Sequence, residues 1–225
     1  MKLRIACLLY VLVSTASIKA APLWLRYPAI SPDGSQIAFT YKGRIYVVSV
    51  NAGGGGNFAR SVTSGESYAC YPVWSPDSKI LAYASDRYGN FDIFTIPASG
   101  GVPTRITANS AQETPFAFSN DGRSIYFGAT ISDPAQSALF PKSYMEELYR
   151  VSVRGGRYER VLATPAQWIC LSDNGESFLY QDRKGGENEW RKHHTSSVTR
   201  HTRSYASASG KHTRPTTSPG AARHP

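Results

Sequence analysis

Short apolar runs with period-two alternation follow one another along most of this chain. In one clear stretch they predict strands at 72–74, 79–84, 91–96 and 102–107. Polar turns separate the runs, among them Ser75–Ser78 and Ser99–Gly101. Alternation over four to eight residues indicates half-buried strands. No stripe with the 3.6-residue period of a helix follows the N-terminal segment, so the pattern predicts an all-β protein.

The same order of strands recurs at a nearly constant spacing. Similar turn sequences lie at 31–34, 75–78, 119–122 and 172–175, with steps of 44, 44 and 53 residues. A repeat of about 40–50 residues with four short strands is typical of a β-propeller blade. We expect a partial propeller over residues 21–195. Its four-stranded antiparallel blades would cover about 22–66, 67–111, 112–166 and 167–217, the last incomplete. Such an arc would leave an apolar flank where a fifth blade packs.

Residues 1–20 have the features of a secretory signal peptide. Lys2 and Arg4 precede nine apolar residues at 5–13, a run too short to span a bilayer. Small residues before Ala21 offer cleavage sites. We therefore expect export, to a periplasm or otherwise, and no membrane span after cleavage.

The net charge of +9 comes from the two ends of the chain. Residues 21–190 hold 15 basic and 16 acidic residues, so the repeats give no reason to expect a nucleic acid partner. Residues 196–225 contain no acidic residue and no Phe, Trp, Leu or Ile. We expect this basic segment to be disordered, or a degraded end of blade four in which only Tyr205 can pack.

Four acidic residues, one in each turn, raise the possibility of calcium sites. They are Asp33, Asp77, Asp121 and Asp173. Because they recur once per blade in one kind of turn, we expect each to accept hydrogen bonds from its own loop. The run Gly53–Gly56 lacks the Lys-Ser/Thr and the helix of a phosphate loop, so we interpret it as a hairpin turn.

No catalytic residue, cofactor or metal site is predicted. Ser67 only half resembles a nucleophile elbow, and residues 21–190 contain no histidine to act as its base. The histidines come later, and we expect no functional metal ligation from His193, His194, His201, His212 or His224. Cys70 and Cys170 belong to blades that are not neighbours. We favour two separate thiols over a disulfide, with Cys170 facing the core.

One polar loop is a candidate binding surface. Arg87, Tyr88 and Asn90 lie at a predicted blade edge, where they could contact peptide carbonyls or a neighbouring domain. The alternative is structural, an inter-blade salt bridge through Asp86 and Arg87.

Several stretches resemble the propeller repeats of tricorn-type proteases. They are Tyr-Pro-Val-Trp-Ser-Pro-Asp-Ser at 71–78, Ala-Ser-Asp-Arg-Tyr-Gly-Asn-Phe-Asp-Ile at 84–93, and Pro-Ala-Ser-Gly-Gly at 97–101. TolB and dipeptidyl-peptidase propellers share looser versions. Stretches 137–141, 147–151 and 187–200 resemble the exported bacterial tricorn homologues in particular. The resemblance covers about residues 22–200.

The resemblance implies a non-catalytic N-terminal propeller of a periplasmic serine peptidase. In such a protein it would filter or bind unfolded polypeptide. PDZ-like and peptidase domains would follow, and they hold the family's catalytic Ser and His, which no position here matches. The alternative is a stand-alone periplasmic propeller similar to TolB that binds partner proteins.

Export gives the first prediction. We expect the mature protein to begin after cleavage between residues 16 and 21, which intact-mass and N-terminal peptide mass spectrometry would measure. Protein that keeps Met1 and stays in the cytoplasm would contradict this.

Overall fold

The computed structural model describes residues 24–50, 58–131, 145–182 and 200–215. Its regular structure consists of four four-stranded antiparallel sheets, which confirms the predicted fold class. In these residues no helix is long and apolar enough to cross a membrane. The signal segment, Gly53–Gly56, His193, His194 and His224 lie outside the described residues.

Each sheet is one blade with its strands in chain order. Blade one contains β1 (Arg26–Ile30), β2 (Gln36–Tyr41), β3 (Arg44–Ser49) and β4 (Arg60–Ser61). Blade two contains β5 (Ala69–Trp74), β6 (Ile80–Ser85), β7 (Asp92–Pro97) and β8 (Thr104–Arg105). Blade three contains β9 (Glu113–Phe118), β10 (Ser124–Ala129), β11 (Glu147–Ser152) and β12 (Glu159–Leu162). Blade four contains β13 (Ala166–Leu171), β14 (Ser177–Asp182), β15 (Thr202–Ala206) and β16 (Lys211–Thr213).

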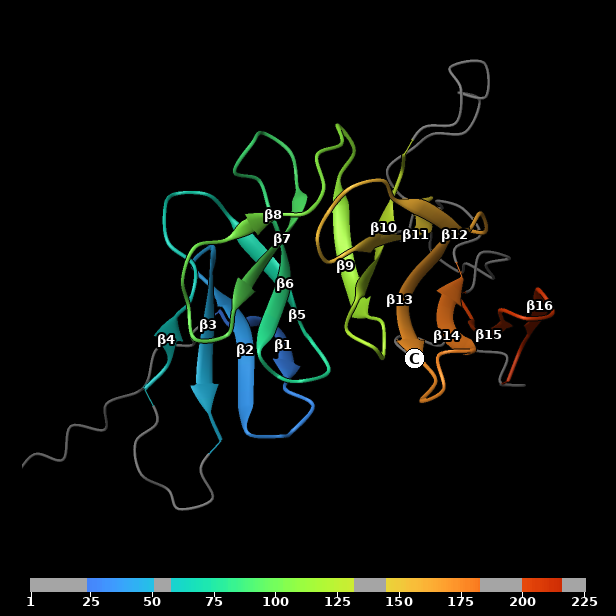
Figure 1. Cartoon of the computed structure of the whole chain (residues 1–225), viewed down its shortest axis with the longest axis horizontal. Coiled ribbons are helices and arrows are strands. Elements are labelled where there is room, and N and C mark those ends of the chain that lie inside the picture. The colour runs from blue at the N-terminus through green and yellow to red at the C-terminus, as the bar shows by residue number, and fades with distance from the viewer. Residues whose placement is uncertain (1–23, 51–57, 132–144, 183–199, 216–225) are drawn as a thin grey trace, which may run out of the picture.

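The first strands of the blades form the inside of the arc. Strand β1 contacts β5, β5 contacts β9, and β9 contacts β13. The last strands form the outside, and β4 and β16 lie at opposite sides of the molecule in Figure 1. Every connection within a blade joins neighbouring antiparallel strands. The contacts between first strands make the inner strands a place where the four blades meet.

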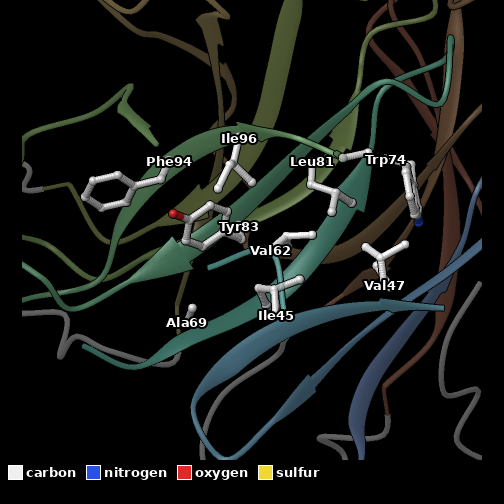
Figure 2. Packing of buried hydrophobic residues seen from close by; sticks show 11 residues of the cluster. Ile45, Val47, Val62, Ala69, Trp74, Leu81, Tyr83, Phe94 and Ile96 are labelled. Carbon is white, nitrogen blue, oxygen red and sulfur yellow. The ribbon is translucent and has the colours of Figure 1, made fainter. Parts of the chain in front are cut away.

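Blades two and three each cover the blade before them with an apolar quartet, which we call the leading face. Two residues come from the second strand and two from their partners on the third. In blade two they are Leu81, Tyr83, Phe94 and Ile96, all at most 2% exposed. They pack in one cluster with blade-one residues that include Ile45, Val47 and Val62 (Figure 2). Burial of apolar surface at this junction therefore holds the two blades together.

The leading face repeats around the arc. In blade three it consists of Ile125, Phe127, Tyr149 and Val151, again buried. In blade one the equivalent residues are Ile37, Phe39, Tyr46 and Val48, which are only half-buried. No described blade packs on this face, and the described sheets do not close into a ring.

The flank beyond blade four differs from the expected apolar surface. Residues Phe178, Tyr180 and Tyr205 belong to the cluster shared with blade three. The alternate positions on these two strands are Leu179, Gln181, Thr202 and Ser204, three of them polar, and Gln181 and Thr202 are buried. The large apolar face without a described blade is instead the leading face of blade one.

Residues 202–213 differ from the expectation of a disordered tail. They form β15 and β16 and complete blade four. Tyr205 packs on Phe178 with ring centroids 5.1 Å apart. The Arg203 Nε donates to Asp182 Oδ2 at 2.7 Å. The sequence expectation failed because it looked for an acid within the basic segment, whereas the partner lies on the neighbouring strand β14.

The two cysteines are separate free thiols, as predicted, but Cys170 is exposed and does not face the core. The cause is a register shift in β13 between Gln167 and Cys170. After this shift Ile169 is buried and Cys170 points outward.

Replacing a leading-face residue should destabilise the protein strongly. Phe127 is 0% exposed and stacks on Tyr149 at 5.6 Å. We expect Phe127→Ala to lower the free energy of unfolding by about 3–5 kcal/mol because it leaves a cavity. The control is Val102→Ala, since Val102 is 86% exposed and should cost about 0.5 kcal/mol or less. Urea unfolding followed by circular dichroism measures both, and equal effects would contradict the blade packing described here.

Candidate functional site

An irregularity in the first strand of every blade aims one aromatic side chain at the inside of the arc. The pairing register shifts in β1, β5, β9 and β13. Tyr27, Tyr71 and Trp168 lie at three of these bulges with φ of 53°, 55° and 51°. A left-handed backbone costs a non-glycine residue about 1–3 kcal/mol, and bulges re-aim side chains. Phe116 lies at the fourth bulge.

The four bulges bring these aromatic side chains together. The rings of Tyr27 and Tyr71 have centroids 4.1 Å apart. The rings of Tyr71 and Trp168 are 6.1 Å apart, and Trp168 is also 6.1 Å from Phe116. All four side chains are half-buried. We call this group the axial aromatic cluster; it is the one place where residues from all four blades form a continuous chain of ring contacts within the described structure.

Polar groups border the axial aromatic cluster on one side. Gln167 Nε2 donates to Glu146 Oε2 at 2.9 Å. A Cβ at Gly128 would lie 2.5 Å from the Phe116 ring and 3.2 Å from Glu146 Oε2, so only glycine leaves room for both. Burial first, and then a hydrogen bond with Tyr27, raise the pKa of Tyr71.

The turns between the first and second strands surround a cavity of about 400 Å³ next to this cluster. Its lining includes the second residue of each turn, namely Pro32, Pro76, Asn120 and Asp173. Phe116 lines this cavity as well as belonging to the axial aromatic cluster. Asn120 Nδ2 donates to the carbonyl oxygens of Ser172 at 2.8 Å and Asp173 at 2.6 Å, which ties the turns of blades three and four together.

The turn acids have the structural role that was predicted, except in blade four. Asp33, Asp77 and Asp121 each accept hydrogen bonds from the serine that begins the turn and from a backbone amide two residues on. In blade four Asn174 accepts these bonds, and Asp173 does not. The prediction for Asp173 was wrong, because the residue that accepts these bonds is always the third residue of the turn, and in blade four this is Asn174.

The loop with Arg87, Tyr88 and Asn90 lies away from the axial aromatic cluster. Asn90 Nδ2 donates to the carbonyl oxygens of Asn109 and Ala111 at 2.7 and 2.8 Å, so it holds the connection to blade three. Tyr88 is 60% exposed and stacks on Phe94. Arg87 donates to the carbonyl oxygen of Ser64 at 3.4 Å.

Asp86 accepts a bond from the Tyr68 amide at 2.7 Å instead of forming the salt bridge that was the alternative. The Arg87 and Asp86 side chains thus hold the backbone of Ser64 and of Tyr68, respectively.

A buried acid lies beneath this loop at the junction of blades two and three. Glu113 is 0% exposed, and its Oε2 accepts a hydrogen bond from Thr107, whose Oγ1 also accepts the Ile93 amide at 2.8 Å. Glu113 Oε1 has no hydrogen-bond partner among the described residues. Burial raises the pKa of Glu113 to about 7, opposed by the Thr107 bond and increased by the nearby Asp92. Arg105 pairs with Asp92 at 2.6 Å.

Comparison with known proteins now adds to this geometry. The sequence profile of the Tricorn protease N-terminal beta propeller domain matches residues 22–225. The chain belongs to this family. The uncharacterized peptidase YuxL of Bacillus subtilis is 26% identical over 144 residues, which make up 59% of this chain and 21% of that protein.

Solved structures agree on the tricorn-type propeller fold. The crystal structure of TolB from Acinetobacter baumannii gives a TM-score of 0.64 at 19% identity, with 86% of this chain and 44% of TolB covered. The crystal structure of the tricorn protease gives 0.58 at 12% identity, with 84% and 22% covered. The chain thus spans less than half the length of each of these relatives.

The sequence interpretation missed the axial aromatic cluster of this tricorn-type propeller. A signal was present, because Tyr27, Tyr71 and Trp168 each lie four residues before the serine of the turn. Ser67 lies on the connection between blades one and two, whereas both described histidines contact blade four: His212 Nδ1 lies 2.8 Å from Tyr180 Oη, and the His201 amide donates to Asp182 at 2.7 Å.

The raised pKa of Glu113 predicts how stability depends on pH. An unfolded glutamate ionises near its ordinary pKa of 4.5, whereas Glu113 keeps its proton to about pH 7. Between these values the folded chain holds more protons, so stability falls as pH rises, by about 3 kcal/mol in all. We expect Glu113→Gln to remove most of this slope in urea titrations between pH 4.5 and 7.5. An unchanged slope in the variant would assign it to another group.

Proposed function

We propose that this chain is the non-catalytic propeller of an exported tricorn-like serine peptidase, and that it binds unfolded polypeptide at its axis. The observation that carries the proposal is the axial aromatic cluster. Aromatic rings from four blades converge on the inner strands, and three of them are held there by strained backbone. Such strain persists where the surrounding structure maintains it, and it concentrates at functional positions.

The chemistry of the cluster suits an extended chain of varied sequence. Half-buried rings offer apolar contact and stacking to any aromatic or aliphatic side chain. Glu146 and Gln167 supply polar groups beside Phe116, where peptide amide groups can find hydrogen-bond partners. A site of this kind binds many sequences weakly and selects against folded domains, because only an unfolded chain presents single side chains to it.

The remaining parts of the proposal follow from the family. A propeller that handles substrate needs a catalytic domain to cut it. In this proposal the nucleophile and its base belong to peptidase and PDZ-like domains outside the described blades. Export is supported by the basic and apolar pattern of residues 1–20. The likeness to TolB favours, as the second candidate, a stand-alone propeller that docks folded partner proteins.

Binding of an unfolded protein tests the proposal. A reduced, alkylated and fluorescently labelled unfolded protein would be titrated with the chain and followed by anisotropy. We expect Trp168→Ala to weaken binding roughly 5-fold, the equivalent of about 1 kcal/mol for one aromatic contact. Tyr88→Ala is the matched control, since Tyr88 is an exposed aromatic residue outside the axial aromatic cluster.

Three outcomes would count against the axial site. Weakening by Tyr88→Ala alone would place binding at the loop of Arg87 and Tyr88, and equal weakening by both variants would show that the axial aromatic cluster has no special role in binding. No binding of unfolded protein together with binding of a folded partner would support the TolB-like candidate. Circular dichroism of each variant confirms that the blades remain folded.

A further inference from the structure

A second cavity lies at the opposite end of blade one from the turn cavity. Its volume is about 890 Å³, within the range of ligand pockets. The start of β1, the hairpin between β2 and β3, and the connection to blade two at 65–68 form its walls. None of its lining residues belongs to the axial aromatic cluster, so this cavity is a separate site. That its ligand is a peptide rests on the function proposed above.

Positive side chains dominate the walls of this cavity. Arg26, Lys42 and Arg44 line it, against a single acid, Glu66. Arg26 lies 5.8 Å from the Trp24 ring centroid and Lys42 lies 5.4 Å from that of Tyr41. Arg44 donates to the carbonyl oxygen of Gly65 at 3.3 Å. Within the described ranges none of the three cations forms an ion pair, so the cavity retains uncompensated positive charge.

The cavity also contains a buried hydroxyl that lacks a partner. Thr40 lines it and is 2% exposed, yet its Oγ1 makes no hydrogen bond to any described residue. The equivalent residues of blades two and three are Ala84 and Gly128, which carry no polar side chain. A buried polar group without a partner is unfavourable, and a ligand oxygen would relieve this.

We propose that this cavity, the blade-one cation pocket, binds the carboxylate of a peptide. Guanidinium and ammonium groups form charge-assisted hydrogen bonds with carboxylates, and Arg does so in two-pronged geometry. The rings of Trp24, Tyr41 and Tyr68 line the same cavity and give apolar contact to the residue that bears the carboxylate. The three cations outweigh Glu66 for either anion, so charge alone does not separate a carboxylate from a phosphate, and the aromatic rings favour a ligand whose anionic group is attached to an apolar body.

Four peptides identify the source of the carboxylate. Their sequence is Ala-Gly-Phe-Xaa-Gly-Ala with Xaa as Glu or Gln, and each has a free or an amidated C-terminus. Isothermal titration calorimetry with the full chain should show that at least one carboxylate-bearing peptide binds tenfold or more tightly than the Gln amide. The Glu amide and the Gln acid distinguish a side-chain from a terminal carboxylate.

Variants test whether the carboxylate binds in this pocket. We expect Arg26→Gln with Lys42→Gln to weaken carboxylate binding about tenfold. The control removes two exposed cations elsewhere, by Lys79→Gln with Arg123→Gln, and should leave affinity within twofold. Thr40→Val should weaken binding a few-fold without lowering the melting temperature, since it removes an unpaired hydroxyl at constant shape.

Any of three results would overturn the proposal. One is equal binding of the Gln amide and the carboxylate peptides. Another is equal weakening by the control pair. The third is displacement of the peptide by inorganic phosphate at a lower concentration than by acetate, which would assign the pocket to a phosphate ligand.

Discussion

The packing of each leading face on the blade before it is the interaction on which the rest of the structure depends. No single four-stranded blade buries its apolar quartet alone, so each blade is stable only in contact with a neighbour. Tyr83 and Phe127 are at equivalent positions, and both are buried at a blade junction. The spacing of 44 residues between them therefore places an apolar side chain at the same junction position in each blade. This packing fixes the angle between blades and hence where the inner strands meet.

The inner strands carry the aromatic site, because the fixed angle between blades brings these strands together. A bulge places an extra residue on one strand, and that residue takes a different direction from its neighbours in the regular ladder. In this chain that residue is aromatic in all four blades. The backbone strain at Tyr27, Tyr71 and Trp168 is offset by the packing between blades, which holds the strands in register. The buried Glu113 junction and the blade-one cation pocket depend on the same frame, because both lie where two blades meet.

The sequence predicted the features that repeat and missed those that depend on register or distance. Ile37, Leu81 and Ile125 follow one spacing, so fold class and blade number were predictable. The exposure of Cys170 was not, because a bulge of one residue reverses the face on which it lies. The pairing of Arg203 with Asp182 joins residues on neighbouring strands across a segment of the chain, which composition alone does not reveal. The axial aromatic cluster joins blades two and four, and only the angle between blades brings Tyr71 to Trp168.

The contact between Tyr71 and Trp168 tests most directly that four blades converge on one aromatic site. Nuclear Overhauser effects between the ring protons of these two residues can be assigned with single-residue variants. Their centroids are 6.1 Å apart, so cross-peaks should be present, together with those from Trp168 to Phe116. If the Phe127–Tyr149 cross-peaks within blade three are present and the Tyr71–Trp168 cross-peaks are absent, the blades fold but do not converge, and the axial site does not exist.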